Sequence, residues 1–167
     1  MTDAEMRPML EQVLHDTPVL TLAHHNSIMT KMPSKSTESR WHQDRRYWSF
    51  ENDNLVSVWL ALVEENMENG VLEFVPGSHK LTFRPEQFDA ETSFMTGIPE
   101  NDAVLADRVH YDLHPGDVVI FHCRTLHHAF HNSTDKPKIS FVYTVKGQGN
   151  QAKPGTRSSR FPEIVLQ

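Results

Sequence analysis

Hydrophobic positions along the chain predict one amphipathic helix near its start. In residues 2–15 the apolar side chains recur at intervals of three and four, the period of a helix with one buried face. Thr2 or Asp3 is suited to cap the first turn, because a short polar side chain there accepts a backbone N–H hydrogen bond. Pro18 follows the end of the helix. The apolar face comprises Met6, Met9, Leu10, Val13 and Leu14.

Beyond this helix the pattern changes to short runs rich in β-branched and aromatic residues, separated by glycine, proline and polar residues. Asn69-Gly70 is a hairpin signal, because a type I′ turn needs positive φ at both positions, and it predicts that the flanking strands pair. Many short strands with such turns favour a sandwich or barrel. The predicted strands are 19–24, 28–32, 55–63, 71–75, 117–122 and 139–145.

Two stretches lack a clear period. Residues 81–105 have mixed polarity and contain Pro85 and Pro99, which indicates a long loop with a short helix. An insertion of this kind is often a lid or a substrate loop. Residues 147–167 are polar and read as an extended C-terminal tail. We therefore expect a single domain over 1–167 with its β-core at about 19–146.

Composition limits the kinds of partner. The 167 residues carry a net charge of −6, with 23% charged and 38% hydrophobic residues, which is typical of a globular domain. The acidic balance does not favour nucleic acid, and there is neither a secretory signal pattern nor an apolar run of transmembrane length. We expect no nucleic-acid or membrane partner and a cytoplasmic location. The oligomeric state does not follow from the sequence.

Histidine is over-represented, at 11 of 167 residues, whereas Cys123 is the only cysteine and excludes a Cys-rich zinc site. His42 and Asp44 stand two residues apart, so on a strand both point to one side and can share a divalent ion. His110 and Asp112 have the same spacing. Non-haem iron sites add a second histidine to such a pair. After the second pair only the tight cluster from His114 to His131 remains to supply a third ligand, so we favour His42 and Asp44.

Several short motifs follow one another along the chain. They are Trp41-His42-Gln43-Asp44, the run 58–62, Glu68-Asn69-Gly70, the turn 76–79, the run 116–122, and Thr125-Leu126-His127 followed by Asn132. In combination and order they resemble the phytanoyl-CoA dioxygenase (PhyH-like) family of Fe(II)/2-oxoglutarate oxygenases, over about residues 19–145. The resemblance implies a double-stranded β-helix (jelly-roll) fold. It also implies Fe(II), 2-oxoglutarate and O₂ as cofactor and cosubstrates, and a small-molecule substrate.

The same resemblance assigns metal ligands residue by residue. His42 and Asp44 match the first two iron ligands of the family, and His127 matches the distal one because it precedes the downstream asparagine. His128 and His131 are the competing choices for the distal position.

Lys138 stands where the family usually has the arginine that holds the distal carboxylate of 2-oxoglutarate. A lysine offers a point charge rather than a bidentate fork, so we expect a weaker or altered anchor. The alternative is a surface lysine beside Pro137. Gln43 and Trp59 resemble positions that line the cosubstrate pocket.

The residues after the metal pair suggest a substrate surface. Arg45, Arg46, Tyr47 and Trp48 combine two cations with two aromatic rings, which suits an anionic or ring-bearing substrate. The alternative is a loop with packed rings and solvated arginines. Related halogenases have a small residue in place of the ligating carboxylate, so the intact Asp44 favours hydroxylation or a related oxidation.

These expectations converge on a dioxygenase that hydroxylates a small organic substrate and releases succinate and CO₂. Two alternatives stay open: a cupin-type metal-dependent isomerase, and a non-catalytic jelly-roll domain that binds a metal or ligand. The departure at Lys138 supports both alternatives. So does the N-terminal part, which is short relative to the family.

Overall fold

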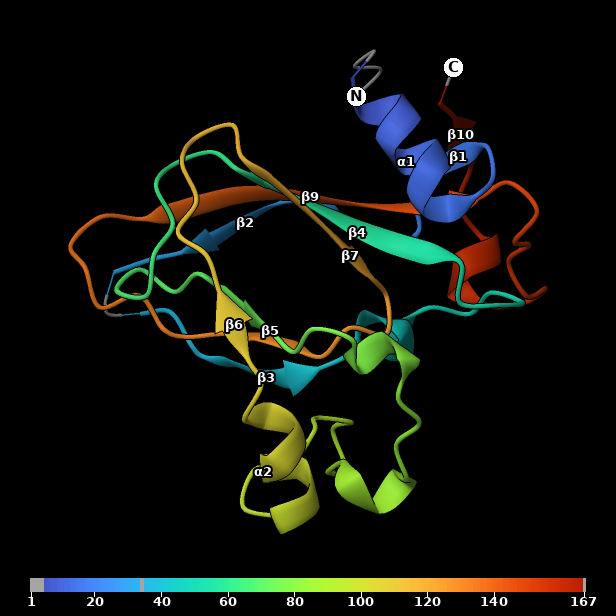
Figure 1. Ribbon diagram of the computed structural model, residues 1–167. Coiled ribbons are helices and arrows are strands. Elements are labelled where there is room, and N and C mark those ends of the chain that lie inside the picture. Colours follow the sequence, from blue (N-terminus) through green and yellow to red (C-terminus); the bar gives the residue numbers. More distant parts are fainter. Residues whose placement is uncertain (1–4, 34, 167) are drawn as a thin grey trace.

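The computed structural model describes residues 5–33 and 35–166, which fold mainly into two facing antiparallel β-sheets (Figure 1). The large sheet has the order β10-β1-β9-β4-β7, with β2 also paired to β9, and the small sheet has the order β3-β8-β5-β6. The prediction of a mainly β fold is confirmed. The strands are β1 (Pro18–Thr21), β2 (Asn26–Lys31), β3 (Ser39–His42), β4 (Leu55–Ala61), β5 (Leu72–Phe74), β6 (Val109–His110), β7 (Val118–His122), β8 (His127–Ala129), β9 (Lys138–Gly147) and β10 (Glu163–Val165).

Strand β9 organises the large sheet. Along one edge it pairs first with β2 and then with β1, while β4 runs along its other edge. Because side chains alternate along a strand, Val142 packs between the sheets, whereas Tyr143 and Val145 face the outside. The same alternation places Trp59 of β4 beside Val142 in the space between the sheets.

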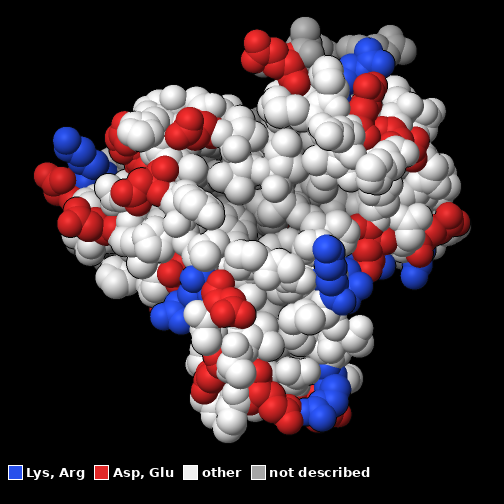
Figure 2. All heavy atoms as spheres, viewed as in Figure 1, with Lys and Arg blue, Asp and Glu red and all other residues white. Residues whose placement is uncertain are grey.

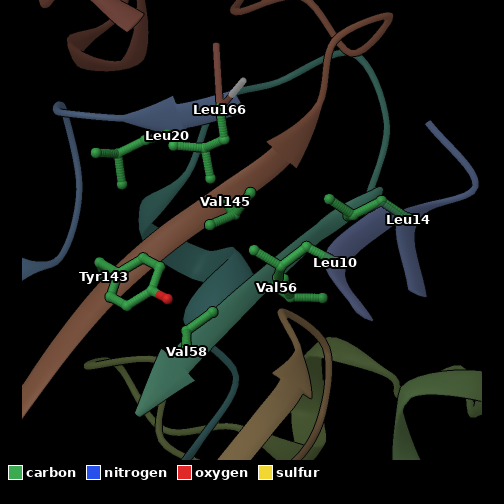
Figure 3. Packing of buried hydrophobic residues seen from close by; sticks show 8 residues of the cluster. All are labelled: Leu10, Leu14, Leu20, Val56, Val58, Tyr143, Val145 and Leu166. Atoms are coloured by element: carbon green, nitrogen blue, oxygen red, sulfur yellow. The ribbon is translucent and has the colours of Figure 1, made fainter. Parts of the chain in front are cut away.

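Helix α1 (Met6–Leu14) covers the outer face of the large sheet, as Figure 3 shows. Its predicted apolar face is only partly buried, since Met9 and Val13 are 45% and 49% exposed. The predicted caps Thr2 and Asp3 lie outside the described residues. The buried cluster beneath the helix comprises Leu10, Leu14, Leu20, Val56, Val58, Tyr143, Val145 and Leu166.

The hairpin prediction at Asn69-Gly70 is wrong. Strand β4 belongs to the large sheet and β5 to the small one, so the chain crosses between sheets here. Gly70 has φ 87°, but Asn69 is not among the residues with positive φ, so the turn is not type I′. Two hydrogen bonds hold it instead, in which the backbone N–H groups of Asn66 and Asn69 each donate to the side-chain Oδ1 of the other residue. A Cβ on Gly70 would lie 2.5 Å from the carbonyl oxygen of Phe130, so this close approach requires glycine.

The irregular segment 81–105 forms a long loop beneath the small sheet, as predicted (Figure 1). It contains a 3₁₀ turn, η3 (Pro85–Gln87), and a short helix, α2 (Pro99–Leu105). The C-terminal segment contains η4 (Arg157–Ser159) and ends in β10, which pairs with β1 at the edge of the large sheet.

The described residues contain no helix with the length and apolar character needed to cross a lipid bilayer. On the face in Figure 2, acidic and basic side chains are interspersed, and the described residues form no broad basic area there.

Candidate metal centre

Three side chains from separate segments meet beside the space between the sheets. His42 ends β3, Asp44 begins the 3₁₀ turn η1 (Asp44–Tyr47), and His127 begins β8. One donor atom from each lies within 4.8 Å of the others. Asp44 Oδ1 is 3.8 Å from His42 Nε2 and 3.7 Å from His127 Nε2. Two atoms that bind one ion at about 2.1 Å are at most about 4.2 Å apart, so these spacings suit a shared ion.

Strand register explains why residues far apart in sequence come together. His42 of β3 and His127 of β8 are direct cross-strand partners, and their ring centroids are 4.2 Å apart. The expectation that His42 and Asp44 lie on one strand needs a correction, because β3 ends at His42 and Asp44 belongs to η1. Gln43 between them is extended, with φ −117° and ψ 132°, so both side chains still point to one side.

Backbone carbonyls fix the orientation of both imidazoles. His42 Nδ1 lies 2.7 Å from the carbonyl oxygen of Arg40, and His127 Nδ1 lies 3.0 Å from that of Thr125. A carbonyl oxygen only accepts, so each Nδ1 carries a hydrogen and Nε2 is the nitrogen left to bind a metal. Metal-binding histidines in proteins are oriented in this way.

The carboxylate of Asp44 is also prepared for a cation. The residue is 3% exposed, and its Oδ2 accepts a hydrogen bond of 2.5 Å from Ser57 Oγ, which leaves Oδ1 facing the imidazoles. Burial raises the pKa of Asp44, but His127, His25 and Ser57 lower it by more, so the carboxyl is ionised. Burial lowers the pKa of His42 to about 3, which keeps this ring neutral. Two imidazoles and one carboxylate form the ligand set of non-haem Fe(II) oxygenases.

His25 was not predicted as a site residue. Its Nε2 lies 3.6 Å from Asp44 Oδ1, on the segment between β1 and β2 where the chain leaves the β9 ladder. No sequence spacing links His25 to Asp44. His25 lies near Asp44 because the chain leaves its pairing with β9 between β1 and β2.

The competing histidines lie elsewhere. His128 points to the opposite side of β8, where its Nε2 lies 2.7 Å from Glu73 Oε2. His131 is exposed beyond the strand. The structure therefore brings His127, and neither His128 nor His131, to Asp44.

An inner cavity of about 440 Å³ extends from the three side chains and is also lined by Trp59 and Lys138. Lys138 is 2% exposed, so the alternative of a surface lysine is excluded. Its Nζ lies 3.0 Å from Glu65 Oε2 and 5.0 Å from the centre of the Trp59 ring. Glu65, which was not predicted, also accepts hydrogen bonds from Trp59 Nε1 at 3.1 Å and Ser140 Oγ at 2.5 Å.

Two predicted site residues do not reach this centre. Gln43 does not line the inner cavity, because its Nε2 donates to the carbonyl oxygen of Arg124 on the other side of the chain. The prediction that it lines the cosubstrate pocket is therefore wrong. Arg45 pairs with Asp53 and donates to the carbonyl oxygen of Trp48, so it stabilises the loop rather than facing a substrate.

A larger outer cavity of about 910 Å³ adjoins the inner one, and both are lined by His25 and His42. Arg46 lines the outer cavity, as does Trp48, although Trp48 is only 2% exposed. The Arg46 guanidinium lies 4.5 Å from the centre of the Tyr47 ring. These three positions of the predicted substrate surface thus face one space.

Comparison with known proteins agrees with this geometry. The family model described as Phytanoyl-CoA dioxygenase (PhyH) matches residues 1–140. The mouse (Mus musculus) protein named "Phytanoyl-CoA dioxygenase, peroxisomal" is 31% identical over 121 residues, which are 68% of this chain and 36% of that protein. The chain therefore spans little more than a third of this relative's length.

Solved structures show the same fold. The epimerase SnoN, crystallised with Fe³⁺, alpha ketoglutarate and nogalamycin RO, is 26% identical and has a TM-score of 0.76 over 93% of this chain and 60% of its own. The non-heme monooxygenase ThoJ is 17% identical, with a TM-score of 0.77 over 99% of this chain and 59% of its own. The predicted jelly-roll is confirmed, and the chain belongs to the phytanoyl-CoA dioxygenase (PhyH) family.

Proposed function

We propose that this protein is an Fe(II)- and 2-oxoglutarate-dependent dioxygenase that hydroxylates a small organic molecule, with His42, Asp44 and His127 holding the iron. The observation that carries the proposal is the preset orientation of the two imidazoles, which turn Nε2 toward Asp44 while Nδ1 is held by a backbone carbonyl. A set of two histidines and one carboxylate leaves open positions for cosubstrate and O₂. All three side chains line the inner cavity.

When bound, iron supplies the oxidising chemistry in which O₂ and 2-oxoglutarate are consumed and succinate and CO₂ are released. The protein contributes position and exclusion of water. Lys138 offers its ammonium to the distal carboxylate of 2-oxoglutarate, and Trp59 forms an apolar wall beside it. Ser57 keeps the Asp44 carboxylate in place through its hydrogen bond to Oδ2.

The outer cavity is the proposed substrate site, because His25 and His42 line it whereas Lys138 and Glu65 do not. The guanidinium of Arg46 favours a substrate with an anionic group. The rings of Tyr47 and Trp48 favour one that also carries a ring or an apolar body.

Epimerisation is a second candidate outcome. SnoN, at 26% identity, is described as an alpha ketoglutarate dependent epimerase. An oxygenase site of this kind is therefore compatible with a reaction whose product is a stereoisomer of the substrate and contains no added oxygen. This outcome differs from a cupin-type isomerase, because it still depends on 2-oxoglutarate.

The test is release of succinate from 2-oxoglutarate by the purified protein with Fe(II) and ascorbate in air. We expect slow succinate release without added substrate, and its loss in His42→Ala and Asp44→Ala. The matched control His131→Ala, which removes an exposed histidine, should keep it. Succinate absent from the wild type, together with no absorption change when 2-oxoglutarate meets the anaerobic Fe(II) protein, would contradict the proposal. Metal uptake without succinate would instead support a binding domain.

A further inference from the structure

The polar wall of the inner cavity carries less positive charge than Lys138 alone suggests. Lys138 and Glu65 form a buried ion pair at 3.0 Å, so their charges compensate each other. Glu65 is 1% exposed and is held in place by Trp59 and Ser140. A carboxylate that enters this wall therefore meets a pair with no net charge, which gives little attraction for an anion.

A second lysine lies beside this pair. Lys31 of β2 is the direct cross-strand partner of Lys138 of β9, and it lines the same cavity. Because glycine has no side chain, Gly70 leaves room for the aliphatic part of Lys31; a Cβ on Gly70 would lie only 2.9 Å from Lys31 Cδ. The two lysines thus reach the cavity from neighbouring positions on one sheet.

The ammonium of Lys31 has only neutral hydrogen-bond partners among the described residues. Its Nζ donates to the carbonyl oxygens of Thr37 at 2.9 Å and Ala129 at 3.4 Å. An ammonium has three N–H groups, so one is left for a ligand. Unlike Lys138, Lys31 forms no ion pair with a carboxylate of the described residues that would cancel its charge.

We infer that Lys31 is a second cationic contact for the distal carboxylate of 2-oxoglutarate and supplies the net positive charge of its subsite. The inference rests on the proposed function, since that function defines the ligand. Within the group of Lys31, Lys138 and Glu65, two lysines and one glutamate leave one positive charge, which matches one carboxylate; Lys35 also lines the cavity but is exposed. The pair of lysines thus takes the place of the bidentate arginine that Lys138 replaces.

The protonation state of Lys31 should make the affinity for 2-oxoglutarate depend on pH. Burial and the charge of Lys138 lower the pKa of Lys31 to about 8, while Glu38 raises it. Lys138 faces it from β9, Glu38 faces it from the segment before β3, and Glu65 acts through its pair with Lys138. As pH rises through 8, Lys31 loses its proton and its attraction for the carboxylate. A single proton with this pKa predicts about a tenfold rise in the 2-oxoglutarate Kd between pH 7 and pH 9.

The test is calorimetric titration of the Mn(II)-loaded protein with two ligands, 2-oxoglutarate and 2-oxopentanoate. The second ligand keeps the 2-oxo acid but ends in a methyl group. We expect Lys31→Met to weaken 2-oxoglutarate binding about tenfold at pH 7 and to leave 2-oxopentanoate binding unchanged. Lys31→Arg should retain the affinity and lose the pH dependence, because an arginine stays charged. The matched control is Lys136→Met, which removes an exposed lysine outside the cavity.

The outcomes separate the inference from the function on which it rests. If Lys31→Met binds 2-oxoglutarate as the wild type does, or loses both ligands equally, Lys31 is a structural contact and the inference is overturned. If the wild-type protein binds neither Mn(II) nor 2-oxoglutarate, the proposed function fails and the inference fails with it. If Lys31→Met does not fold, Lys31→Arg and the wild-type pH series still decide the question.

Discussion

Nζ of Lys138 lies 3.0 Å from Oε2 of Glu65, and the side chains are 2% and 0% exposed. Neither charged group is solvated. Each charge is therefore stabilised by the other, and the carboxylate is also stabilised by the hydrogen bonds that Trp59 and Ser140 donate to it. The cavity beside the metal centre is thus bounded by a pre-formed polar cluster rather than by a free cation.

Removing one member of this pair should destabilise the fold more than removing both. Lys138→Met leaves Glu65 buried without its counter-charge, and we expect a loss of about 3–5 kcal/mol in the free energy of unfolding. Adding Glu65→Gln to Lys138→Met removes the uncompensated charge, so the double variant should recover about half of that loss. Urea denaturation measures both. The exposed control Lys136→Met should stay within about 0.5 kcal/mol of the wild type. Equal losses in the single and double variants would contradict the coupling.

Ser57→Ala should weaken metal binding without removing a ligand. The hydroxyl donates a 2.5 Å hydrogen bond to Asp44 Oδ2 and so holds the carboxylate with Oδ1 toward the imidazoles. Loss of such a supporting contact typically costs about 10–100-fold in metal affinity. Calorimetric titration of the metal-free protein with Mn(II) measures this change. The control is Ser133→Ala, since the exposed Ser133 hydroxyl has the carbonyl oxygen of Glu68 as its only hydrogen-bond partner in the described part of the chain. Unchanged affinity in Ser57→Ala would show that Asp44 is held by other contacts.

His24 should make the protein less stable in mild acid. It is 8% exposed, its Nε2 lies 2.7 Å from Ser158 Oγ, and burial, followed by Arg157, lowers its pKa to about 4. Between about pH 6.5 and pH 4 the unfolded chain takes up a proton that the folded chain does not, so stability falls as pH falls. The slope for one proton is at most about 1.4 kcal/mol per pH unit.

Urea denaturation of wild type and His24→Gln between pH 7 and pH 4.5 isolates this contribution, because the other titrating groups are common to both proteins. The variant should lose stability less steeply on acidification. Parallel slopes would show that His24 takes up its proton in the folded state as readily as in the unfolded one.

The three side chains of the candidate metal centre could be predicted to lie together because their signals are local. The motif around His42 and Asp44 indicates one pair, and the run ending in Leu126-His127 indicates the third residue once the family resemblance is recognised. The structure adds the reason why they meet, which is the cross-strand register between His42 and His127.

Other contacts depend on pairing across the sheets, which no local pattern encodes. The Asn69-Gly70 signal predicted a hairpin, but the next strand joins the opposite sheet. Glu65 reaches Lys138 from 73 positions away, and Lys31 reaches it only through the β2–β9 register. Gln43 and Arg45 were predicted to face ligands, yet a backbone carbonyl and Asp53 engage them instead.

The most direct test of the metal centre is a crystal structure of the protein with Mn(II) and 2-oxoglutarate, in which the anomalous signal of manganese locates the ion. We predict one ion about 2.0–2.2 Å from His42 Nε2, Asp44 Oδ1 and His127 Nε2, with the distal carboxylate of 2-oxoglutarate against Lys138. An ion bound elsewhere, or a 2-oxoglutarate whose distal carboxylate points away from Lys138, would contradict it.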